Sequence, residues 1–255
     1  MENKPQFPAE EVTLPSKGLL YPEDSPLRSG KIEMKYMTAR EEDILTNQNY
    51  IKNGTAVDRL LKSLIITSDI KYKDLLLGDK NAIMIAARIL GYGAEYEIQR
   101  THPETDIISD ATINLSQISD KELDEKLIKN GKNEFEFTLP TSKINITFKL
   151  LTEGDDKKID RELEGLKKIK KESSEGIIRL KHTILSIDGN YEPKTIRDFI
   201  DNDLLARDAR AFRKYINEIQ PGIDMNVNIE FKDGYVEESV YMPIGINFFW
   251  PDAEL

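Results

Sequence analysis

Apolar and charged residues alternate along several short segments of the chain, and this period of two predicts β-strands with one buried face. The alternation runs through the segment 31–37. It recurs at 94–100, around 111–115, and at 134–140, 143–151, 225–231 and 235–242. Turn-forming residues at 101–106 separate the segments 94–100 and 111–115, and those at 232–234 separate 225–231 and 235–242. The sequence therefore predicts two or more antiparallel hairpins.

A second pattern, with apolar residues three or four positions apart, predicts helices. The segment 83–90 is apolar nearly all round, which places its helix at the centre of the core, with Asp79 as its expected cap. Thr38 and Glu41 have the spacing of a capping box, so a helix is expected to begin at about Ala39. Further helices are predicted at 56–65, 119–128, 153–176 and 193–219, and 177–187 is ambiguous, with helix favoured.

Together these elements predict an α+β fold, with a mainly helical body that carries two or more antiparallel β-hairpins. Five prolines among the first thirty residues remove backbone donors and fix φ, so an extended arm is expected there. The chain then divides into a proline-rich arm at 1–30, a strand and helical core at 31–93, a β-hairpin region at 94–152, a helical region at 153–221, and a C-terminal hairpin with an aromatic tail at 222–255.

Two apolar clusters lie in the arm and the tail, and both are candidates for docking on a partner. Large aromatic rings bury about 150–250 Å² each, which makes them effective anchors. For each cluster the alternative is packing into the core of the chain itself. The candidate docking residues are Leu14, Leu19, Leu20, Tyr21, Phe248, Phe249 and Trp250.

Charge and composition narrow the range of partners. The 255 residues include 46 acidic and 36 basic side chains, a formal net charge of −10 that repels phosphate backbones. Nucleic acid is therefore not expected as a partner, and proteins with basic surfaces are. The chain has no cysteine, which excludes disulfides, thiolate nucleophiles and cysteine-based zinc sites. We find no signal peptide and no apolar stretch of membrane-spanning length, so no membrane partner is expected.

The residue types that catalysis needs are not arranged in any recognisable pattern. The two histidines, His102 in a turn and His182 in a predicted helix, are too far apart in sequence to suggest a metal site. No glycine-rich phosphate loop is followed by Lys-Ser or Lys-Thr, and no hydroxyl nucleophile has a base beside it. We therefore predict a protein that is not an enzyme, with no catalytic, cofactor-binding or metal-binding residues and no small-molecule substrate.

A cluster of basic residues occupies the last predicted helix. Acidic residues are interspersed among them, so the cluster is interpreted as a salt-bridged, solvated face. The basic members are Arg207, Arg210, Arg213 and Lys214, and the acidic ones are Asp203 and Asp208.

Four longer stretches carry a resemblance to a known family. They read VTLPSKGLLYPEDSPL at 12–27, GKIEMKYMTAREEDILTNQNYIKNGTAVDRLLKSLI at 30–65, LLARDARAFRKYINEIQPGID at 204–224 and PIGINFFWPD at 243–252. They resemble blocks of the T4-like bacteriophage baseplate proteins, a family linked to the central hub of the baseplate and its assembly. The resemblance implies other baseplate and tail proteins as partners, in the host cytoplasm during assembly or in the virion tail.

One departure from that family concerns metal. Many relatives carry Cys-Pro-x-Cys turns in two hairpins, which resemble zinc ribbons. The matching turns here, 101–106 and 232–237, contain no cysteine, so no metal is expected and the hairpins are expected to be held by packing and ladder hydrogen bonds.

The sequence and the resemblance together favour a non-enzymatic protein that acts in assembly of the baseplate hub through protein–protein contacts, as an assembly factor or chaperone. The alternative is a permanent structural subunit of the baseplate or tail. A degenerate ribbon-type nucleic-acid-binding module comes third, and an enzyme last. The oligomeric state does not follow from the sequence.

Overall fold

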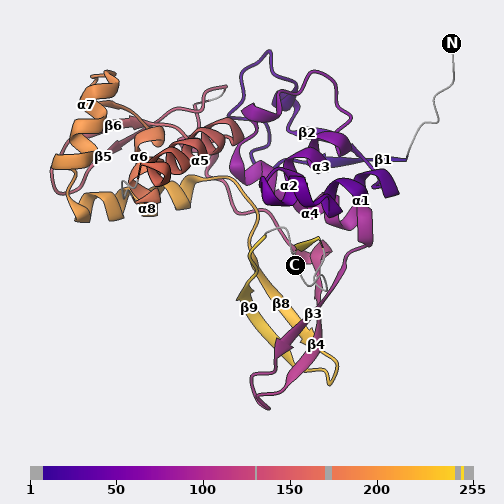
Figure 1. Ribbon diagram of the computed structural model, residues 1–255. Coiled ribbons are helices and arrows are strands. Elements are labelled where there is room, and N and C mark those ends of the chain that lie inside the picture. Colours follow the sequence, from indigo (N-terminus) through magenta and orange to yellow (C-terminus); the bar gives the residue numbers. More distant parts are fainter. Residues whose placement is uncertain (1–7, 130, 170–173, 245–247, 250–255) are drawn as a thin grey trace, which may run out of the picture.

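The computed structural model describes residues 8–129, 131–169, 174–244 and 248–249. It confirms the α+β class, with antiparallel sheets of two, four and three strands. Figure 1 shows an N-terminal unit, a second unit rich in helices, and a sheet that projects away from both.

The N-terminal unit packs helices against a small sheet. Its elements are β1 (Ala9–Thr13), β2 (Lys31–Lys35), α1 (Ala39–Thr46), α2 (Gln48–Lys52), α3 (Ala56–Leu64) and α4 (Leu77–Tyr92). The predicted capping box is present, since the Thr38 amide donates to the Glu41 carboxylate at 3.1 Å, and α1 begins at Ala39 as expected. The apolar helix α4 is buried along most of its length, which confirms its central place.

The projecting sheet combines two hairpins that lie far apart in the sequence. One hairpin is β3 (Glu95–Thr101) with β4 (Ile108–Asn114), and the other is β8 (Asn226–Phe231) with β9 (Val236–Tyr241). A short antiparallel pairing of β4 with β8 joins them, so the strand order is β3-β4-β8-β9. Both hairpins match the segments that the alternating pattern predicted.

The second unit surrounds a three-stranded sheet with helices. The strands are β5 (Phe135–Thr138), β6 (Asn145–Phe148) and β7 (Ile184–Ile187), and the helices are α5 (Glu153–Lys168), α6 (Glu175–Thr183), α7 (Pro193–Asp198) and α8 (Ala206–Ile219). Short 3₁₀ turns occupy Pro26–Ser29, Tyr72–Asp74, Leu115–Gln117 and Glu125–Leu127, and a π-helical turn occupies Phe199–Asp203.

Three helix predictions differ from the structure. The segment 177–187 is helical only to Thr183 and then forms β7, because β6 offers a free edge to which it hydrogen-bonds. The expected long helix at 193–219 is interrupted by the π-helical turn and by extended backbone at Leu204 and Leu205. The segment 119–128 has only a 3₁₀ turn.

The described part of the arm folds back on the body instead of extending from it. Strand β1 pairs with β2, and the Leu14 amide donates to the Gly30 carbonyl at 2.8 Å to close the loop between them. Gly18 adopts a φ of +74°, and a Cβ there would lie 2.3 Å from the Arg28 carbonyl oxygen. Only glycine fits this crossing of the loop, because any larger residue would collide with backbone.

Candidate functional site

The loop between β1 and β2 is anchored to α4 through a buried carboxylate. Ser16 donates to Asp79 from its amide (2.9 Å) and from its hydroxyl (2.7 Å). Tyr21 Oη donates to the same carboxylate at 2.6 Å and accepts from the Leu76 amide at 2.9 Å. Asp79 was expected to cap its helix, but α4 begins at Leu77 and the Asp79 side chain binds the loop instead.

Asp79 is fully buried, and it forms no ion pair with any residue that the structure describes. Burial raises the pKa of the Asp79 carboxyl, and the three hydrogen bonds that it accepts only partly oppose this effect. Burial and the neighbouring Asp79 likewise raise the pKa of Tyr21. The network therefore positions the loop, while the carboxylate charge itself is poorly stabilised.

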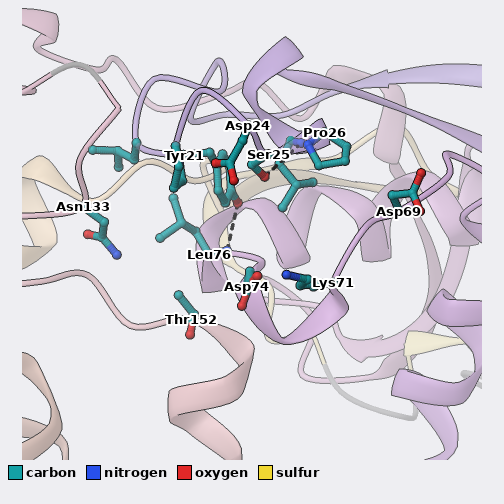
Figure 2. A pocket seen from close by; sticks show the side chains of 13 residues that line it. Tyr21, Asp24, Ser25, Pro26, Asp69, Lys71, Asp74, Leu76, Asn133 and Thr152 are labelled. Carbon is teal, nitrogen blue, oxygen red and sulfur yellow. Dashed lines mark hydrogen bonds between the residues drawn. The ribbon is translucent and has the colours of Figure 1, made fainter.

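A groove of about 640 Å³ opens beside the anchored loop, shown in Figure 2. Apolar side chains form its floor, and carboxylates stand at its rim. Those carboxylates are exposed, and none forms an ion pair or side-chain hydrogen bond with another described residue. We call this feature the acidic groove; the residues that define it are Leu20, Tyr21, Leu27 and Leu76 in the floor and Asp24, Asp69 and Asp74 at the rim.

Two docking candidates of the arm, Leu20 and Tyr21, line this groove, but the candidates of the arm are mostly covered by the chain. Leu14, Leu20 and Tyr21 are 0%, 2% and 4% exposed, and they belong to the main apolar core. Leu19 is half-buried. A partner that approaches the described arm would therefore meet the carboxylates at the rim of the groove and little of Leu14, Leu20 or Tyr21.

The tail candidates divide between described and undescribed residues. Phe248 and Phe249 are buried, and the Phe248 ring centroid lies 5.2 Å from that of Tyr96. Trp250 lies outside the described residues. Phe248 thus packs on strand β3 of the projecting sheet, and the Phe249 ring lies 5.6 Å from that of Phe248. Docking by the tail stays a prediction.

His102 joins the turns of the two hairpins at the outer end of the projecting sheet. Its ring is 3% exposed and lies 4.6 Å from the Phe231 ring and 4.8 Å from the Tyr235 ring. Nδ1 accepts the Glu104 amide at 3.1 Å, and Nε2 lies 3.2 Å from an Asp233 carboxylate oxygen. The turns at 101–106 and 232–237 are therefore brought together around one imidazole.

The basic cluster on α8 is arranged differently from the prediction. Asp208 is buried and accepts the backbone amides of Thr141 (2.7 Å) and Ser142 (2.9 Å), so it does not pair with the arginines. These amides hold the pKa of Asp208 at about 2 by outweighing the effect of desolvation. Lys214 pairs with Glu218 at 3.5 Å. The exposed residues Arg207, Arg210 and Arg213 form no ion pair with any described residue.

A cluster of alternating charges connects the N-terminal unit to α5. Lys80 on α4 lies 2.9 Å from Asp58 on α3 and 2.5 Å from Glu153 on α5, and Lys157 also contacts Asp58. Burial alone would raise the pKa of Asp58, but the two lysines outweigh it and hold the value at about 2. Sequence reasoning missed this cluster, because nothing local marks these charges among 82 charged residues (36 basic and 46 acidic).

Other kinds of site find no support in the part of the chain that the structure describes. That part contains no group of three or more His, Cys, Asp or Glu side chains placed to hold a metal ion. None of its helices has both the length and the apolar character to cross a membrane.

Comparison with known proteins gives one match. The family model described as "T4 bacteriophage base plate protein" matches residues 11–250. No curated protein and no solved structure matches the chain.

Proposed function

The chain belongs to the T4 bacteriophage base plate protein family, and from this premise we propose that it acts in assembly of the baseplate hub, as a non-enzymatic protein that holds other tail proteins through protein–protein contacts. The match spans almost the whole chain, so the premise applies to all three units. The role as an assembly factor goes beyond the family match. The surface described next supports docking on other proteins, which both an assembly factor and a permanent subunit would need.

The observation that carries this proposal is the outer end of the projecting sheet. Ile107 and Ile108 are 64% and 69% exposed, and Val236 is 43% exposed. All three stand beside the turns that point away from the body in Figure 1. Exposed apolar side chains at the end of a projecting element favour contact with another protein, because docking removes their surface from water at about 25 cal/mol per Å².

Reversing this apolar character tests the proposal. The assay is the yield of a phage whose own copy of the protein is missing and is supplied from a plasmid. We expect the double variant Ile107→Asp with Ile108→Asp to lower this yield by about tenfold or more, without lowering the melting temperature of the protein. Ile169→Asp is the matched control, since Ile169 is also 69% exposed but lies at the end of α5. Equal yields from the two variants would contradict a docking role for the sheet.

Quantitative mass spectrometry of purified virions beside infected-cell lysate distinguishes the two forms of the proposal. An assembly factor is expected to be abundant in lysate and absent from virions. Stoichiometric presence in virions, at a multiple of three or six per particle, would instead make the chain a permanent structural subunit, which is the alternative drawn from the sequence.

A further inference from the structure

Two surfaces of the described chain carry unpaired charge of opposite sign. The first is the acidic groove, where Asp24, Asp69 and Asp74 surround an apolar floor, with Lys71 as a neighbouring positive charge. Figure 2 shows Asp24 and Asp74 on opposite sides of the groove. A ligand that fits this arrangement presents an apolar side chain with cationic groups beside it.

The second surface is the exposed side of α8 and the residue before it. Arg207, Arg210 and Arg213 follow one another at intervals of three, so their guanidinium groups lie on neighbouring parts of the helix surface. Leu205 precedes them and is 46% exposed, which is unusual for a leucine beside a buried helix face. We call Leu205, Arg207, Arg210 and Arg213 the arginine strip.

The two surfaces match in charge and in the placement of an apolar group. A leucine followed by arginines is the complement of an apolar floor with a carboxylate rim, and guanidinium groups form the strongest ion pairs with carboxylates. The groove belongs mainly to the N-terminal unit, whereas α8 lies in the other unit (Figure 1). Each chain therefore carries two complementary surfaces, the acidic groove and the arginine strip, in different units.

We infer that copies of this chain associate head to tail, with the arginine strip of one copy in the acidic groove of the next. Because the two surfaces differ, the contact is heterologous, and it produces a ring where the rotation closes and an open chain of copies where it does not. Leu205 enters the apolar floor, and Arg207 and Arg210 pair with the rim carboxylates. This inference concerns contacts between copies, and it does not depend on the proposed role in hub assembly.

Sedimentation velocity of the full chain tests this inference over a roughly hundredfold range of concentration. We expect the mass to rise above that of one chain at about 50 mM salt and to fall towards it at about 500 mM, because salt screens exposed ion pairs. Arg207→Glu with Arg210→Glu and Arg213→Glu should weaken self-association by at least about tenfold, as should Asp24→Lys with Asp69→Lys and Asp74→Lys. The control is Lys194→Glu with Arg197→Glu, two exposed residues of the nearby α7, and it should associate as the wild type does.

Mixing the two triple variants gives the decisive result. Each variant retains one intact half, and the two reversed halves are opposite in charge to each other. An equimolar mixture should therefore associate again, in assemblies where copies of the two variants alternate, whereas neither variant associates alone. A wild-type chain that stays a single copy at every concentration would overturn the inference. So would self-association that the triple variants leave unchanged, or a mixture in which the two variants do not associate.

Discussion

At the scale of single residues, the buried acids decide how distant parts of the chain meet. Asp79 receives two donors from Ser16 and one from Tyr21, so a single carboxylate holds the loop between β1 and β2 on α4. From the sequence, Asp79 is one more acid in the first turn of a helix. Its role depends on donors about sixty positions earlier, which no local pattern reveals.

Removing the Asp79 carboxylate should destabilise the fold. Asp79→Ala leaves three buried donors without an acceptor, so we expect the free energy of unfolding to fall by about 3 kcal/mol or more. Tyr21→Phe removes one of these hydrogen bonds and also the acceptor of the buried Leu76 amide, so it should cost about 2 kcal/mol. Urea unfolding of the wild type, Asp79→Ala and Tyr21→Phe measures both losses of stability. Equal losses for the two variants would contradict the conclusion that the Asp79 carboxylate holds the loop.

The raised pKa of Asp79 also predicts a dependence on pH. Because its folded pKa lies above its unfolded value, its contribution to stability is complete below the unfolded pKa and is lost as pH rises through the folded pKa. The stability of the wild type relative to Asp79→Asn should therefore decrease as pH rises from about 4, near the unfolded pKa of an aspartate, towards neutrality. A difference that grows with pH would show that the hydrogen bonds outweigh burial.

At the scale of elements, the projecting sheet depends on contacts between its two hairpins. The ladder between β4 and β8 is short, with Ala111 opposite Phe231 and Thr112 opposite Glu230. The His102 ring, packed against Phe231 and Tyr235, adds the contact at the outer end. The alternating pattern predicts each hairpin, but it does not reveal that the two hairpins share one sheet.

Truncating His102 should loosen this sheet before the rest of the molecule. We expect His102→Ala to cost about 2–3 kcal/mol, because it leaves a cavity between two aromatic rings. His102→Phe keeps a ring there but loses the acceptor for the Glu104 amide, so its cost should be about 1 kcal/mol. Hydrogen exchange is the measurement: protection should fall in β3, β4, β8 and β9 and persist in α4, and uniform loss would contradict a separately opening sheet.

At the scale of the whole molecule, the N-terminal unit and α5 are connected by Asp58, Lys80, Glu153 and Lys157. The carboxylates of Asp58 and Glu153 are 8% and 3% exposed, so these pairs are little screened by solvent. The charges come from α3, α4 and α5, and their attraction connects the two units.

The Asp58 carboxylate of this cluster should make the fold sensitive to acid, whereas burial raises the pKa of Glu153 and gives it the opposite dependence. The pKa of Asp58 is held at about 2, below its unfolded value, so its contribution is present above the unfolded pKa and is lost as pH falls towards 2. We expect Asp58→Asn to lower stability at neutral pH by about 2 kcal/mol, with the difference from wild type vanishing in acid. Asp110→Asn, at an exposed pair with Lys232, is the control and should change stability little at any pH. A constant difference for Asp58→Asn would contradict this account.

The sequence by itself determined what depends on neighbours a few positions away. The period of two located the strands of both hairpins, the period near 3.6 located α3 and α4, and Thr38 with Glu41 determined where α1 begins. It also determined the family, since the resemblance at 12–27 and 243–252 agrees with the match over residues 11–250.

Only the tertiary structure decided which strands share a sheet and which charges are paired. The segment 184–187 is a strand because it pairs with the edge of β6. Asp208 accepts the backbone amides of Thr141 and Ser142 and does not pair with the arginines. The acidic groove likewise exists only because the loop between β1 and β2 folds onto α4. These outcomes depend on contacts between distant residues, whose free energies exceed local preferences and leave no periodic trace in the sequence.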